Sequence, residues 1–229
     1  YYAATTTLNE VSHLKLHMYA LGGALLLAGC ADKPAPAQPI AVETIEPLTL
    51  TPIHVAPEQK ATYYAQYEEI IERINGIGYD VELQLQPLAK FTDNDWLSVE
   101  QFEQIASARA KAKMVVQTND EPVSPALVPK FVTLQSNTFS ADIRFEGAFN
   151  TQLSENTETG RQLFDAFYSI TSAAVNEHAT WTQLGFDATL STDKTTYTVS
   201  VGGTYSEYGI SSSHIIEIPF VCDEVGGIS

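Results

Sequence analysis

Two stretches of the chain repeat their apolar residues every three or four positions, the spacing that places side chains on one stripe of a helix. The first stretch runs from Glu58 to Asn75 and is followed by Gly76, a residue type that commonly ends helices. Charged residues fall on its other side, so we expect one buried and one solvated face. The apolar stripe consists of Tyr63, Tyr67, Ile70, Ile71 and Ile74.

The second stretch begins at Ser98, in the sequence LSVEQFEQIASARAKAK. A serine here can accept a hydrogen bond from the backbone at the start of a helix, and Gln101 stands at the spacing of a capping box. This pattern predicts a second amphipathic helix. The residues that follow its helical period are Phe102, Ile105, and either Ala106 or Arg109.

From residue 131 onward, apolar and polar residues alternate, which is typical of half-buried strands. Residues 139–153 alternate along their length, residues 179–206 predict a hairpin that turns near Ser191 to Lys194, and residues 213–222 predict a final strand. Two shorter strands are expected earlier, over residues 79–85 and 114–118.

One segment, residues 160–175, fits two structures. Its serines, Thr171 and Tyr168 suit a strand, but four apolar residues match a helical period, and we favour a helix. The four residues are Leu163, Phe164, Phe167 and Ile170.

These elements together predict an α+β fold, in which two or three helices pack on a mainly antiparallel β-sheet and the C-terminal half is β-rich. We expect a single domain over residues 58–229, helix-rich to about residue 130 and β-rich from residue 131. About 170 residues are enough to bury a sizeable core.

Ahead of this domain, an apolar run from Met18 to Gly29 ends at Cys30. As a helix it would span about 18 Å, too short for a hydrocarbon core of roughly 30 Å, but suited to a secretory signal. The residues Leu27-Ala28-Gly29-Cys30 resemble the lipobox of bacterial lipoprotein precursors. The resemblance implies that Cys30 carries diacylglyceryl and further acyl chains such as palmitate, which anchor the protein in a membrane.

On this interpretation residues 1–29 are a signal segment, and residues 1–13 are upstream read-through if translation begins near Leu14 or Leu16. Residues 30–57 are rich in proline and predict a semi-rigid tether. The expected location is the extracytoplasmic face of a bacterial membrane.

The formal net charge of −16 limits the partners. Nucleic acids require basic patches, so they are excluded as partners, and the membrane contact is expected to be made by the lipid alone. Beyond Cys30 the only cysteine is Cys222. Because Cys30 is expected to carry lipid, Cys222 has no second thiol with which to form an intramolecular disulfide. Its place at the end of an apolar run indicates a small buried residue.

Motifs that carry chemistry are scarce, and no cofactor-binding sequence is present. His178, in the sequence NEHATW with Glu177 beside it, is the best candidate for an acid–base residue. Scattered histidines argue against a zinc site. Asp93, Asp95 and Glu100 could bind calcium, but acids at the start of a helix explain them equally well.

Four aromatic residues are candidates for a sugar-stacking face, namely Trp96, Trp181, Tyr205 and Tyr208, although aromatic residues in sheets more often belong to the core. Two stretches, TWTQLGF and TYTVSVGGTY, resemble uncharacterised exported domains of Gram-positive bacteria. That resemblance implies no activity, and the domain resembles no family of known function.

The sequence therefore favours a non-catalytic binding or interaction module of the cell envelope, with an envelope protein, peptide or glycan as its ligand. An exported hydrolase that acts on envelope polymers or peptides is the alternative, and a purely structural envelope component, which would have a flat apolar patch and no pocket, is a third possibility. The two interpretations differ in the surroundings of His178, since a hydrolase requires it in a cleft beside an acid and a nucleophile.

Overall fold

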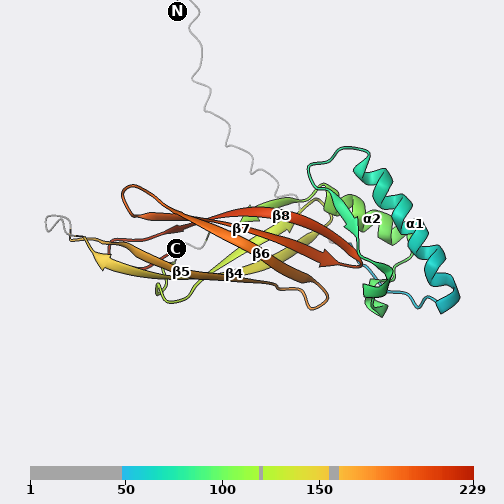
Figure 1. Cartoon of the computed structure of the whole chain (residues 1–229), viewed down its shortest axis with the longest axis horizontal. Helices are drawn as coiled ribbons and strands as arrows, with labels where there is room; N and C mark the ends of the chain where they lie inside the picture. The colour runs from blue at the N-terminus through green and yellow to red at the C-terminus, as the bar shows by residue number, and fades with distance from the viewer. Residues whose placement is uncertain (1–47, 119–120, 155–159) are drawn as a thin grey trace, which may run out of the picture. The chain divides into compact units, whose positions relative to one another are not determined.

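The computed structural model describes residues 48–118, 121–154 and 160–229 (Figure 1). The expected signal segment, Cys30 and most of the tether lie outside these residues. Among the residues described, no helix is long and apolar enough to cross a bilayer. The elements are α1 (Pro57–Asn75), β1 (Leu83–Leu85), α2 (Val99–Ala110), β2 (Lys113–Val116), β3 (Val128–Gln135), β4 (Ser140–Leu153), β5 (Gln162–Ala174), β6 (Thr180–Leu190), β7 (Thr196–Glu207) and β8 (Ile210–Val221), with short 3-10 turns at Leu88–Lys90 and Asp93–Asp95.

The strands form two antiparallel sheets of four strands each, in the orders β1-β8-β7-β6 and β2-β3-β4-β5. Aromatic rings from the two sheets meet in the core: the ring of Phe149 on β4 lies 4.7 Å from Phe220 on β8 and 5.7 Å from Tyr197 on β7. The described part of the chain is therefore a β-sandwich with helices at one end (Figure 1). The predicted α+β class and β-rich C-terminal half are confirmed, with the strands divided between two sheets.

Alternating residues build the sandwich core as the sequence indicates. On β4 the buried row contains Ala141, Ile143 and Phe145, and on β7 it contains Val199 and Val201. Because successive side chains of a strand point to opposite faces, each row faces the other sheet and the polar residues between them face solvent.

The prediction of a helix over residues 160–175 is wrong, because this segment is strand β5. Two irregularities in its pairing with β4 insert Asp165 and Tyr168 as extra residues. The inward-facing side chains are consequently Phe164, Phe167 and Ile170, spaced by three. Two bulges thus give a strand the apolar spacing of a helix.

The two predicted helices are present, and local chemistry sets their ends. Ser98 accepts a hydrogen bond from the backbone N–H of Gln101 at 3.2 Å, as expected of an N-cap. Asn75, the last residue of α1, exchanges two hydrogen bonds with the backbone of Leu83 and so covers the edge of β1. The strand expected over residues 79–85 is confined to Leu83–Leu85.

Candidate functional site: a groove beside helix α2

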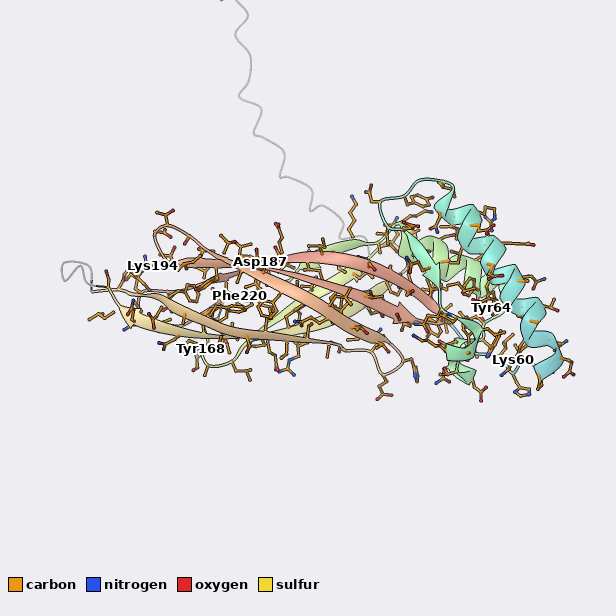
Figure 2. The ribbon with its side chains drawn as sticks, in the orientation of Figure 1. Lys60, Tyr64, Tyr168, Asp187, Lys194 and Phe220 are labelled. Atoms are coloured by element: carbon orange, nitrogen blue, oxygen red, sulfur yellow. The ribbon has the colours of Figure 1, made fainter. Side chains whose placement is uncertain are left out.

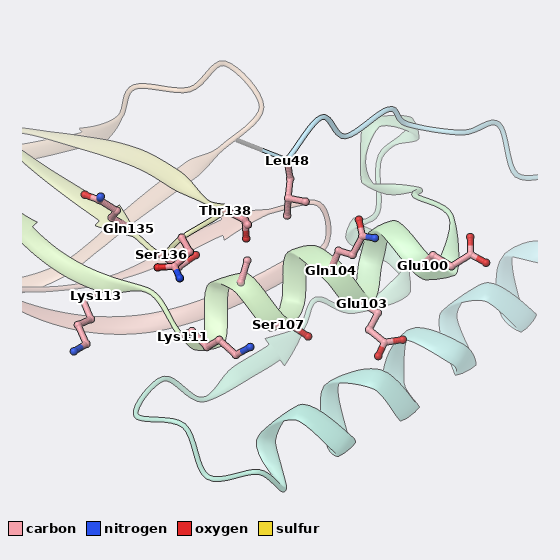
Figure 3. A pocket seen from close by; sticks show the side chains of 12 residues that line it. Leu48, Glu100, Glu103, Gln104, Ser107, Lys111, Lys113, Gln135, Ser136 and Thr138 are labelled. Carbon is pink, nitrogen blue, oxygen red and sulfur yellow. The ribbon is translucent and has the colours of Figure 1, made fainter. Parts of the chain in front are cut away.

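An open groove of about 830 Å³ lies beside α2 in the described chain. One wall is the outer face of α2, and the other is the turn between β3 and β4 together with Leu48 (Figure 3). This volume is in the range of ligand sites. The lining residues are Leu48, Glu100, Glu103, Gln104, Ser107, Ala108, Lys111, Lys113, Gln135, Ser136, Asn137 and Thr138.

The α2 wall follows from helical geometry. Residues three and four positions apart share one face, so the polar stripe that begins at Glu100 and ends at Lys111 points away from the core. The opposite stripe contains Phe102, Ile105 and Ala106, all buried. The opposite wall is fixed where the backbone N–H of Leu48 donates to the carbonyl oxygen of Thr138 at 3.0 Å.

The groove has charges of opposite sign at its two ends. Glu100 and Glu103 lie toward the start of α2, whereas Lys111 and Lys113 follow its end (Figure 3). Glu103 is partly neutralised by Arg73, whose guanidinium is 2.9 Å away. In the described chain, neither Glu100 nor Lys113 has an ion pair, so both are available to a ligand.

Between these ends the lining is uncharged and rich in hydrogen-bonding groups. The hydroxyl of Ser136 is inaccessible to solvent, and among the described residues it has no hydrogen-bond partner. Buried polar atoms in native proteins usually have a partner. The side chains of Gln104, Ser107 and Gln135, which line the groove, suit a ligand that is itself polar.

Beneath the groove, the inner face of α2 carries a buried arginine. Arg109 is 0% exposed, and its guanidinium donates to the carbonyl oxygens of Tyr205, Glu207 and Ile210 and to the hydroxyl of Ser212, at 2.8–3.2 Å. Burial lowers the pKa of Arg109 to about 10, while Tyr205 and Glu207 act in the opposite direction. The side chain remains charged at neutral pH, so its four acceptors tie α2 to the β7–β8 hairpin.

The groups around Arg109 form a buried polar network. Glu207, 7% exposed, accepts a hydrogen bond from the hydroxyl of Tyr205 at 2.9 Å. Burial, and then the charge of Glu207, raises the pKa of Tyr205, so the phenol stays protonated. His214 lies 2.8 Å from the Ser212 hydroxyl, and burial followed by the charge of Arg109 lowers its pKa to about 4.

The tip of the β7–β8 hairpin is enclosed by the segment that precedes α2. The turn residues Tyr208 and Gly209 have φ angles of 51° and 72°, the left-handed conformation of a tight hairpin turn. The N–H of Gly209 donates to the carboxylate of Asp95 at 2.8 Å. A Cβ on Gly209 would lie 2.3 Å from the ring of Phe91, so only glycine fits. Asp95, one of the three acids that could bind calcium, therefore has a structural role as the acceptor for this turn.

The residues singled out from the sequence do not form one site. His178 is exposed in the turn between β5 and β6, and among the described residues it has no hydrogen bond or ion pair. Trp181 is buried, and its indole N–H donates to the hydroxyl of Ser172 at 2.8 Å. Tyr205 is in the core, and Tyr208 is half-buried at the hairpin tip. Cys222 is a buried free thiol, as its sequence position indicates.

Sequence reasoning missed the groove because its two walls are distant in sequence, and each wall alone has the composition of an ordinary solvated surface. Arg109 left a detectable signal, since it occupies the apolar stripe of a helix whose other members are buried. A charged residue in such a position rarely becomes fully buried unless polar partners surround it.

Comparison of the chain with protein-family profiles, curated protein sequences and solved structures finds no match. The site is therefore interpreted from its own chemistry.

Proposed function

We propose that this protein is a non-catalytic binding module of the bacterial cell envelope, anchored through lipid on Cys30, and that the groove beside α2 binds an extended peptide. The observation that carries the proposal is the groove itself, with opposite charges at its ends and hydrogen-bonding groups between them. A peptide in an extended conformation presents the same sequence of features, since its backbone amides lie between its terminal charges.

The length of the groove agrees with a short peptide. Eleven positions separate Glu100 from Lys111, which at 1.5 Å per residue is about 16 Å along the helix. An extended chain advances about 3.3–3.6 Å per residue, so roughly five residues would reach from one end to the other. The ligand's cationic end belongs beside Glu100 and its anionic end beside Lys111 and Lys113.

The alternative, an exported hydrolase, receives no support from His178. That residue is exposed in the β5–β6 turn, whereas the lining of the groove contains neither a histidine nor a cysteine. The hydroxyls of Ser107 and Ser136 therefore lack a neighbouring base of the kind that activates a serine nucleophile.

The proposal is tested with a labelled pentapeptide, Lys-Ser-Ser-Ser-Glu, in fluorescence anisotropy titrations. We expect saturable binding that is at least about tenfold tighter, or 1.4 kcal/mol, than binding of the reversed sequence Glu-Ser-Ser-Ser-Lys. The reversed peptide has the same composition, but it places the lysine next to the terminal carboxylate and so weakens the separation of charge.

Two variants of the groove should reduce this binding. Ser107→Trp fills the centre of the groove, and Lys113→Glu reverses a charge at its end. The matched control is Lys194→Glu, which makes the same change of charge in the β6–β7 turn, labelled at the far end of the sandwich in Figure 2. Equal loss of binding in Lys113→Glu and Lys194→Glu would show that only net charge matters and would contradict the groove.

A further inference from the structure

The two sheets meet along the edge strands β5 and β6, which do not pair with each other by backbone hydrogen bonds in the described structure. Near the β5–β6 turn, side chains close this junction. Trp181 donates to the hydroxyl of Ser172 at 2.8 Å, and the amide of Gln183 donates to the carbonyl oxygen of Ile170 at 3.2 Å. Farther along, over residues 163–169 of β5 and 184–190 of β6, no such hydrogen bonds between the two strands are found. We call this part the open seam.

Large apolar side chains gather on the open seam. Tyr168 and Leu184 are the extra residues of bulges in β5 and β6, and they are 65% and 71% exposed. Phe186 belongs to the inward-facing row of β6 but is still 50% exposed, and its ring lies 5.6 Å from that of Phe167. Figure 2 shows Tyr168 on β5, away from the helices.

The other two sheet edges are protected, and the open seam is not. The edge of β1 is only three residues long and is bonded to Asn75 of α1. The edge of β2 is four residues long and begins with Lys113, a residue type that discourages strand pairing. In contrast, β5 and β6 have 13 and 11 residues. Long edges with exposed apolar side chains pair readily with other chains.

The open seam contains few charged residues, and this limits the kind of partner that can bind there. The protein has a net charge of −16, but the seam contains only one acid on each strand, Asp165 and Asp187, and no base. Asp165 also accepts a hydrogen bond from the amide of Asn150 at 2.9 Å. A basic partner would find few carboxylates here. A second copy of this chain can approach at this place with less like-charge repulsion than at more acidic parts of its surface.

We infer that the open seam is a self-association surface, through which two copies of this chain form a symmetric dimer. The exposed parts of Tyr168, Leu184 and Phe186 amount to roughly 400 Å² per copy, given the usual areas of such side chains. Two copies would bury about 800 Å² from these residues alone, and backbone pairing along the strands brings the total to about 1,000–1,200 Å². That area corresponds to a weak, reversible dimer.

The test is sedimentation velocity of the full 229-residue chain, expressed without lipid modification, between about 5 and 300 µM, with a reductant present because Cys30 and Cys222 are then both thiols. We expect a monomer–dimer equilibrium with a Kd on the order of 10–100 µM. Raising NaCl from 0.05 to 0.5 M should strengthen the dimer severalfold, because salt screens the repulsion between two acidic copies. Association that weakens with salt would instead indicate pairing of opposite charges elsewhere.

The matched variants are Leu184→Asp in the seam and Ile215→Asp on the outer face of β8, where Ile215 is 80% exposed. Both replace an exposed apolar residue with the same charge, and neither removes a buried contact, so both should fold. Leu184→Asp should raise the Kd at least tenfold, whereas Ile215→Asp should change it less than twofold. A strictly monomeric chain, or a dimer that responds equally to both variants, would overturn the inference.

Discussion

The two ends of the sandwich are stabilised in different ways. At the helical end, stacked aromatic rings such as Tyr67 and Phe102 are joined by a directional polar network, in which one guanidinium, that of Arg109, reaches four acceptors on the β7–β8 hairpin. At the far end, contacts are between rings, with centroids 4.7–5.8 Å apart. The rings are those of Phe149, Phe164, Phe167, Tyr197 and Phe220.

The difference matters for the groove, because the groove lies at the helical end, beside the polar network. In apolar packing, a substitution that removes volume is destabilising, but one that keeps a similar shape is tolerated. In a hydrogen-bonded network, a substitution is tolerated only if the new side chain donates in the same directions. Since α2 has Arg109 on one face and the groove on the other, the network that orients Arg109 also fixes the position of that wall of the groove.

The largest effect is expected from Arg109→Ala. It leaves buried carbonyl oxygens and the hydroxyl of Ser212 without their donor and opens a cavity, which together should lower the free energy of unfolding by about 4 kcal/mol. Arg109→Met fills most of the volume but restores no donor, so it should remain destabilised by about 3 kcal/mol. Urea denaturation measures both. If Arg109→Met is as stable as the wild type, the contacts at this end are not directional as described.

At the far end, Phe149→Ala should lower the free energy of unfolding by about 3 kcal/mol, because the ring contacts four other aromatic rings. Phe149→Leu retains much of the volume and should cost only about 1 kcal/mol. In both pairs of variants, the larger replacement keeps most of the side-chain volume but loses the specific contacts. Comparing Phe149→Leu with Arg109→Met therefore shows whether volume or specific contacts stabilise each end. A loss in Phe149→Leu as large as in Phe149→Ala would mean that ring geometry, rather than volume, dominates there.

Acid should weaken the helical end through His214. Its pKa is lowered from the ordinary 6.5 to about 4 in the folded state, so between pH 7 and pH 5 the unfolded chain binds a proton that the folded chain does not. Stability should therefore fall by about 2 kcal/mol over this interval. Denaturation at both pH values measures the fall, and His214→Gln should remove most of it. A fall of the same size in His214→Gln would place the responsible group elsewhere.

The sequence predicted much of the local structure because local rules determined it. The apolar stripe of α1, the serine cap of α2 and the alternation of β4 and β7 each correspond to one element. Strand β5 was missed since its bulges at Asp165 and Tyr168 produce a spacing of three, and bulges depend on pairing with β4. The division into two sheets also depends on contacts between distant segments.

The candidate site was less predictable than the fold. Its walls come from α2 and from the β3–β4 turn with Leu48, which no local pattern connects. The residues chosen from the sequence, Trp181 and Tyr205 among them, are conspicuous by type but serve the core. Only Arg109 combined an unusual residue type with an unusual position.

Chemical-shift mapping would show directly whether the groove beside α2 binds a peptide, as we propose. Amide and methyl signals of the isotope-labelled chain would be followed during titration with Lys-Ser-Ser-Ser-Glu. We expect the shifting signals to lie on the outer face of α2, on Lys113 and in the β3–β4 turn, and the signals of the far aromatic end to stay unchanged. Shifts concentrated on any other surface, or no saturable shifts at millimolar peptide, would contradict it.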